Sequence, residues 1–140
     1  MFEYQNVVVA LDIYSEYEMV LERALNIAQS SKHLHLVHVT LPQVYFEPYG
    51  AAFNSDFVTD IREQAKTRLN SIAEKLHIQS DQVHAVLGDP AAEIHKVAKD
   101  VHADLIVIGT HGQSGLKLLL GSTANGVLHG VKCDVLAVKV

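Results

Sequence analysis

Apolar residues in this chain form short runs that alternate with longer segments of helical spacing. The runs Val7 to Leu11, Leu34 to Val39, Val83 to Leu87, Leu105 to Ile108 and Val135 to Val140 hardly alternate with polar residues. Such runs are typical of strands that are covered on both faces. Between them, apolar residues recur every three or four positions and predict helices over about 15–28, 57–76, 90–101 and from 118 or 122 to 129.

Local signals define where several of these helices start and end. Ser15 and Glu18 have the spacing of a capping box, and Asp89 before Pro90 predicts an N-cap followed by the first helical residue. Gly130 is expected to close the last helix. Residues 40 to 54 carry two prolines, a glycine and four aromatic residues, and predict an irregular loop that either covers a site or packs on the surface.

The order of elements predicts an α/β fold. We expect a single domain over 1–140, with a doubly wound, five-stranded parallel sheet of order 3-2-1-4-5 and helices on both faces. Ligands of such folds bind beyond the carboxyl ends of the strands, where the strand order reverses. Asp12 ends the first strand and Gly109 the fourth, so both are expected to face one crevice.

Composition narrows the classes of partner. The chain has 140 residues, 49% of them hydrophobic and 19% charged, with a net charge of −5 and no cluster of Lys and Arg. A basic face for nucleic acid is therefore not expected. No apolar run approaches the roughly 18–20 residues that cross a bilayer, and the first residues do not resemble a signal peptide. The single cysteine, Cys133, suits a reducing compartment, so we expect a cytoplasmic protein.

Four glycines in the segment 109–123 are the strongest indication of a binding site. They follow the most apolar strand and lead into Gly121 and Ser122 at the start of a helix. Glycine admits a close approach of backbone to an anion, and a helix start offers free N–H groups. The segment matches neither the Walker nor the Rossmann phosphate motif. Taken alone, it is equally well explained as a flexible connection between strand and helix.

The whole chain resembles the universal stress protein family. The resemblance rests on the order and spacing of several short motifs, which are Val8-Val9-Ala10-Leu11-Asp12, Leu36-Val37-His38-Val39, Gly88-Asp89-Pro90, Asp104 to Gly112, Gly121-Ser122-Thr123-Ala124-Asn125 and Cys133 to Val138. It implies an adenine-nucleotide alpha-hydrolase-like fold and a regulatory role in the stress response, without an enzymatic activity.

The resemblance also implies a ligand and the residues that bind it. Many members of the family bind ATP, with or without Mg²⁺, at the crevice described above. By resemblance, Asp12 contacts ribose or adenine, Val39 lies against adenine, and the phosphates are held by Gly109, Gly112, Gly121, Ser122 and Thr123. The family also implies a homodimer, and the apolar edge strand Val135 to Val140 is the expected contact.

Two departures keep other functions open. Eight residues separate Gly112 from Gly121, where the nucleotide-binding pattern of the family has nine. The region after Asp12 also resembles the universal stress protein A branch, which lacks the glycine motif and is expected to act through protein contacts alone. A slow ATP hydrolase ranks third, because Asp12 is the only visible candidate for a general base. We expect no metal site, since His33 and His35 on one strand lack a third ligand.

Overall fold

A computed structural model of the protein describes residues 3–40, 55–110 and 122–140. Five parallel strands form one sheet of order β3-β2-β1-β4-β5. The elements run β1 (Val7–Ala10), α1 (Glu18–Ala28), the 3₁₀ turn η1 (Ser31–His33), β2 (Leu34–Thr40), α3 (Ser55–Lys75), the 3₁₀ turn η3 (Ser80–Gln82), β3 (Val83–Leu87), α4 (Pro90–Asp100), β4 (Leu105–Gly109), α5 (Ser122–Leu128) and β5 (Asp134–Val138). The predicted strand order is confirmed.

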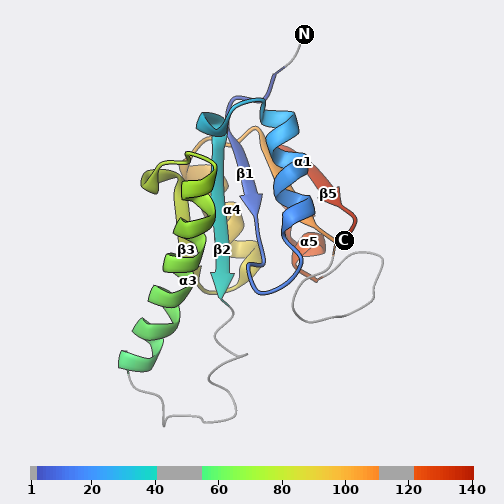
Figure 1. Ribbon diagram of the computed structural model, residues 1–140. Coiled ribbons are helices and arrows are strands. Elements are labelled where there is room, and N and C mark those ends of the chain that lie inside the picture. Colours follow the sequence, from blue (N-terminus) through green and yellow to red (C-terminus); the bar gives the residue numbers. More distant parts are fainter. Residues whose placement is uncertain (1–2, 41–54, 111–121) are drawn as a thin grey trace.

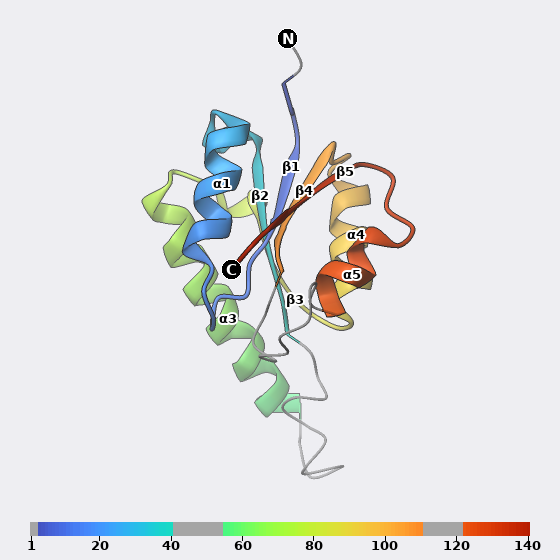
Figure 2. The ribbon, with the colours of Figure 1, turned by 90° about the vertical axis from the view of Figure 1, so that its right-hand side faces the viewer.

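The helices cover both faces of the sheet (Figures 1 and 2). Helices α1 and α3 lie on one face, and α4 and α5 lie on the other. Successive residues of β1 therefore enter different cores: Val7 and Val9 pack beneath α1 and α3, whereas Val8 packs beneath α4. All three side chains are fully buried. This explains why the strands show unbroken apolar runs instead of alternation.

The helix boundaries confirm one predicted start and correct another. Asp89 caps α4, because its Oδ2 accepts a hydrogen bond from the N–H of Ala92 at 2.9 Å, and Pro90 is the first helical residue. The capping box at Ser15 and Glu18 is wrong: α1 begins at Glu18, and its N-cap residue Tyr17 makes no side-chain capping bond. Gly130 follows α5 with a φ of +77°, as expected beyond a helix end.

The two helices on the α4 face approach each other closely. A Cβ atom built on Gly126 of α5 would lie 2.8 Å from Cβ of Ala91 in α4. Nearby, the Nε2 atom of His95 donates a hydrogen bond of 2.7 Å to the carbonyl of Val127. Contact between a glycine and an alanine thus sets the separation of α4 and α5.

The structure locates the single cysteine within the fold. Cys133 is a free, half-buried cysteine that packs against the α4 core, and burial raises the pKa of its thiol. No helix in residues 3–40, 55–110 and 122–140 is long and apolar enough to cross a membrane. The aromatic residues predicted to form a surface or lid segment at 45–53 lie outside the described residues.

Candidate functional site

The sequence-predicted residues of the first, second and fourth strands meet at one edge of the sheet. Ala10 of β1 is level with Val37 of β2 and Ile108 of β4. If this register is continued for two residues beyond Ala10, Asp12 is level with Val39 of β2. On the β4 side, Gly109 is level with Leu11, the residue before Asp12. The carboxyl ends of the three parallel strands lie at the lower end of the sheet in Figure 1, so Asp12, Val39 and Gly109 belong to the same edge.

Asp12 is held at this edge by a tight turn. Its Oδ1 accepts a hydrogen bond from the N–H of Tyr14 at 3.2 Å, and its carbonyl accepts one from the N–H of Ser15 at 3.1 Å. Ser15 is thus part of the turn that follows β1, which explains why it does not cap α1. The turn leaves the Asp12 side chain half-exposed at the end of the strand.

His38 supports the same turn from β2, and sequence reasoning did not select it. Its Nδ1 lies 3.0 Å from the carbonyl oxygen of Leu11. Since a carbonyl only accepts, Nδ1 carries the proton and donates. Burial lowers the pKa of His38, while the Leu11 bond and the nearby Asp12 carboxylate act in the opposite direction. A neutral His38 therefore joins the ends of β1 and β2.

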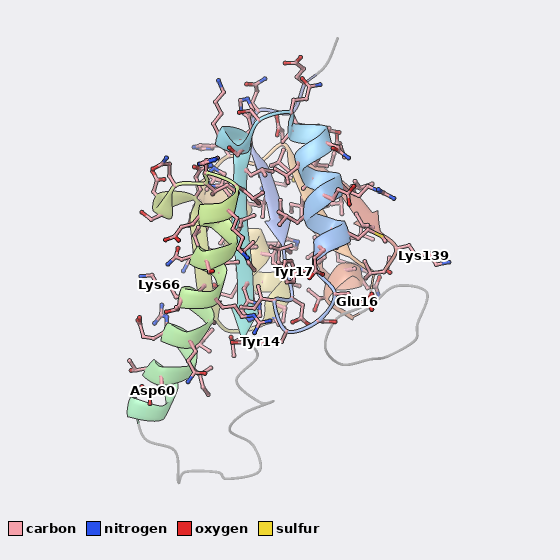
Figure 3. All side chains as sticks on the ribbon, viewed as in Figure 1. Tyr14, Glu16, Tyr17, Asp60, Lys66 and Lys139 are labelled. Atoms are coloured by element: carbon pink, nitrogen blue, oxygen red, sulfur yellow. The ribbon has the colours of Figure 1, made fainter. Side chains whose placement is uncertain are left out.

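Tyr14 adds an aromatic surface beside His38. Figure 3 labels Tyr14. Its ring meets the His38 ring edge to face with centroids 5.5 Å apart, and the guanidinium carbon of Arg68 in α3 lies 5.2 Å from the Tyr14 ring centroid. Tyr14 is 38% exposed. A periodic pattern could not have indicated this cluster, because Tyr14 lies in a turn and its neighbours come from two other elements.

The glycine segment begins and ends on well-anchored elements. Gly109 is the last residue of β4, and the next residue, Thr110, donates its N–H to the carbonyl of Val138 at 2.9 Å. Helix α5 begins at Ser122, and Thr123 is half-buried in its first turn. Gly112 and Gly121 lie outside the described residues, and so does the loop that they were predicted to form.

The histidines do not form the pair that the sequence suggested. His33 lies in the turn η1 before β2, where its Nδ1 is 2.9 Å from the carbonyl of Gln5. His35 faces His84 of β3 instead, with ring centroids 5.8 Å apart. Within residues 3–40, 55–110 and 122–140, no group of three or more His, Cys, Asp or Glu side chains is arranged to hold a metal ion.

Comparison with known proteins shows which family the chain resembles in sequence and structure. The model of the universal stress protein family matches residues 3–139. Universal stress protein A homolog 2 of Coxiella burnetii is 43% identical over 136 residues, which cover 96% of this chain and 92% of that protein. Hypothetical protein MJ0577 has a similar structure, with a TM-score of 0.80, 28% identity, and coverage of 99% of this chain and 98% of that one.

A third similar protein was solved with a nucleotide. It is a universal stress protein in complex with cAMP, with a TM-score of 0.59, 28% identity, and coverage of 99% of this chain and 98% of that one. Together with the matched sheet order and the family model, these similarities settle the relationship. The chain belongs to the universal stress protein family.

Proposed function

We propose that this protein is a regulatory module of the stress response that binds ATP where β1 and β4 end. The observation that carries the proposal is that β1 and β4 are parallel neighbours where the strand order reverses, with Asp12 two residues beyond β1 and Gly109 at the end of β4. This is the position at which open α/β sheets bind ligands. The complex of a 28% identical relative with cAMP supports an adenine nucleotide as the ligand class.

Each residue of the proposed site supplies a different contact. The Asp12 carboxylate accepts hydrogen bonds from ribose hydroxyls or the adenine amino group, and Val39 offers an apolar surface to the base. Gly109, Gly112 and Gly121 supply backbone N–H groups to the phosphates. Ser122 and Thr123 add N–H and hydroxyl groups at the start of α5. Hydrogen bonds from N–H groups to phosphate are charge-assisted, so the site needs no arginine.

The proposed mechanism is a shift of population between conformations. Nucleotide that binds one conformation more tightly raises its share, and a surface present only in that conformation then becomes available to a partner. A homodimer through Val135 to Val140 is part of the proposal, because β5 is an edge strand whose pairing with a second copy satisfies its backbone. The single cysteine supports a cytoplasmic location.

The experiment is to measure bound nucleotide and the stability that it adds. The purified protein is denatured and the supernatant analysed for adenine nucleotide, and the melting temperature is measured with and without ATP, each with and without Mg²⁺. At ATP concentrations about 100 times Kd, binding adds about 2.7 kcal/mol to the free energy of unfolding. We expect Asp12→Ala and Ser122→Ala to reduce the shift, and the exposed, distant Asp100→Ala to preserve it. No released nucleotide together with no shift contradicts the proposal.

One observation favours a second candidate, a stress protein that acts through protein contacts without nucleotide. The spacing between Gly112 and Gly121 is one residue shorter than the nucleotide-binding pattern. Insertion of one glycine after Gly115 restores the pattern and separates the candidates. If only the insertion variant gains an ATP-dependent rise in melting temperature, the second candidate is correct.

Sedimentation at micromolar concentration tests the proposed homodimer, and a monomer contradicts that part of the proposal.

A further inference from the structure

The strand β3 forms the edge of the sheet opposite β5 and exposes part of its backbone. The N–H of Gly88 donates to the carbonyl of Thr40 in β2 at 3.0 Å. Because alternate residues of a parallel strand bond to the same neighbour, His84 and Val86 also direct their backbone groups to β2. The N–H and C=O groups of Ala85 and Leu87 consequently point away from the sheet. An edge of this kind is a template for another strand.

The side chains of β3 do not protect this edge. The strand reads Val83-His84-Ala85-Val86-Leu87, without the lysine or proline that commonly blocks an exposed edge, and all five residues are half-buried. The opposite edge differs, because β5 carries the exposed residues Asp134 and Lys139 at or beside its ends. β3 therefore carries no charged side chain along its edge, and its pairing is separate from the β5 contact proposed for the homodimer.

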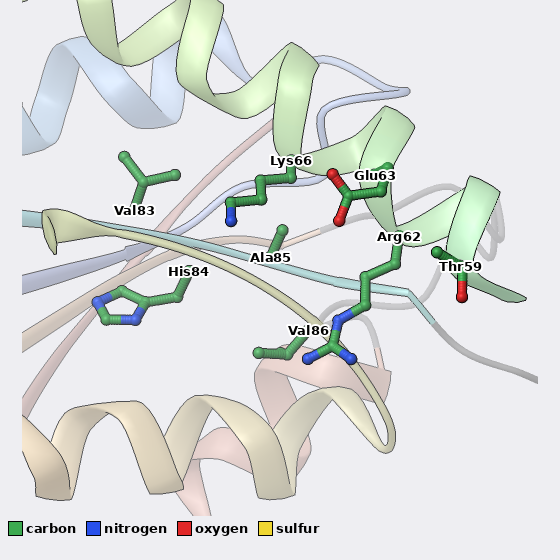
Figure 4. A pocket seen from close by; sticks show the side chains of 8 residues that line it. All are labelled: Thr59, Arg62, Glu63, Lys66, Val83, His84, Ala85 and Val86. Atoms are coloured by element: carbon green, nitrogen blue, oxygen red, sulfur yellow. The ribbon is translucent and has the colours of Figure 1, made fainter. Parts of the chain in front are cut away.

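A groove runs along β3 beneath the side chains of α3 (Figure 4). Its volume is about 430 Å³, and it is lined by Thr59, Arg62, Glu63, Lys66 and the strand residues 83–86. Figure 4 shows Arg62 and Lys66 reaching from α3 toward the strand, with Glu63 between them along the helix. The groove therefore joins an open strand edge to a row of charged side chains.

The charge of the groove is positive in a protein whose net charge is −5. Arg62 and Lys66 contribute two positive charges, against one negative charge from Glu63. Neither cation has an ion-pair partner among residues 3–40, 55–110 and 122–140. A second copy that paired through the same edge in a two-fold dimer would bring another Arg62 and Lys66 to the contact, and like charges would oppose that dimer.

We propose that β3 and the groove beneath α3 bind an extended acidic segment of another protein, which adds to the sheet as a sixth strand. The backbone of the segment pairs with Ala85 and Leu87. Alternate side chains of the segment face the two sides of the sheet, so that acidic residues on one side meet Arg62 and Lys66 while apolar residues on the other lie beside Val86. The surface does not depend on the proposed nucleotide site.

The experiment is an NMR titration of the ¹⁵N-labelled protein with two synthetic peptides. The acidic probe is acetyl-Thr-Glu-Val-Glu-Val-Glu-Thr-amide, and the matched probe carries lysine in place of each glutamate. We expect the acidic peptide to shift the amide signals of Ala85 and Leu87 and to bind on the order of tenfold more tightly than the lysine peptide. Equal affinities, or shifts confined to β5, would overturn the proposal.

Two protein variants test the charge and the backbone separately. The double variant Arg62→Glu, Lys66→Glu is expected to prefer the lysine peptide, whereas Arg23→Glu, Lys132→Glu changes the net charge equally on distant exposed residues and should keep the acidic preference. Ala85→Pro removes an N–H group that points away from β2, so the fold remains and binding is lost. Circular dichroism checks the fold. Unchanged binding by Ala85→Pro contradicts the added strand. Amide signals of Ala85 and Leu87 that shift on dilution without peptide would show self-association through β3 and would contradict it as well.

Discussion

The two ends of the sheet are held together in different ways. At the amino ends of the strands, side chains bond to backbone that is distant in sequence: Asp104 accepts hydrogen bonds from the N–H groups of Gln5 at 2.8 Å and Asn6 at 3.0 Å. At the carboxyl ends, the carboxylate of Asp12 accepts one from Tyr14, two residues away. The same chemical group thus ties separate strands at one end and shapes a single turn at the other. The carboxyl end has a long-range bond as well, but it comes from a neutral histidine, His38, which joins the ends of β1 and β2.

Substitution of Gln82, which lies at the amino end of the sheet directly before β3, should cause the largest loss of stability. Its buried side chain donates to the carbonyls of Leu34 at 2.6 Å and Ser31 at 3.0 Å, and it accepts from the N–H of Gln79 at 3.0 Å. Gln82→Met removes the side-chain partner of the Leu34 carbonyl and of the Gln79 N–H, while the Ser31 carbonyl keeps its bond from the N–H of Leu34. We therefore expect a loss of about 3 kcal/mol in the free energy of unfolding. Urea unfolding measures this loss, with the exposed Gln64→Met as the control. A loss no larger than that of the control would contradict the importance of the amino end.

Asp104 and Asp12 allow a matched comparison of the two ends, with an expected change in the free energy of unfolding smaller than that for Gln82. Asp104→Asn replaces a carboxylate that accepts two long-range hydrogen bonds, and we expect a loss of about 1–2 kcal/mol in the free energy of unfolding. Asp12→Asn alters the turn after β1, and we expect a smaller loss than for Asp104→Asn. Denaturant unfolding of both variants under the same conditions compares them. Equal losses would show that the two ends contribute alike.

Three histidines should make stability depend weakly on pH. Burial lowers the pKa of His35, His84 and His38 from the ordinary value of 6.5. Below pH 6.5 the unfolded chain binds protons that the folded chain resists, so stability is complete above this pH and falls as the pH decreases. The neighbouring charge of His84 acts with burial on His35, whereas Asp81 and Asp100 oppose the effect at His84.

A double variant isolates the pair on β2 and β3. In the wild type, Nδ1 of His35 and Nε2 of His84 are buried without a hydrogen-bond partner among the described residues. His35→Phe, His84→Phe removes both titrations and keeps a ring pair, so unfolding in urea at pH 7.5 and pH 5.5 should differ less than in the wild type. His129→Gln, at an exposed position, is the control. An unchanged difference between the two pH values would exclude the pair as its source.

The sequence predicted the sheet order and most elements because burial on two faces leaves a strong pattern. The runs around Val8 and Ile106 have no polar positions, and only central strands of a covered parallel sheet require this. The start of α1 was wrong because Ser15 serves the turn after Asp12 instead of the helix. A capping signal is short, and a competing turn can use the same residue.

Part of the candidate site could also be predicted. The rule for ligand positions selects Asp12 and Gly109 as soon as the strand order is known. The contacts of His38 with Leu11 and Tyr14, and of Tyr14 with Arg68, depend on side chains from three elements that converge in space. No spacing along the chain encodes such a convergence, so these residues emerge only from the structure.

The close contact between Gly126 and Ala91 has a consequence for the far end of the same helix. Helix α5 is only seven residues long, so a displacement at its middle moves the whole helix, including Ser122 at its start. A methyl group added at Gly126 meets an atom 2.8 Å away and forces such a displacement. The position of the first N–H groups of α5 therefore depends on the contact of Gly126 with Ala91, where the two helices pack so closely that no larger side chain fits.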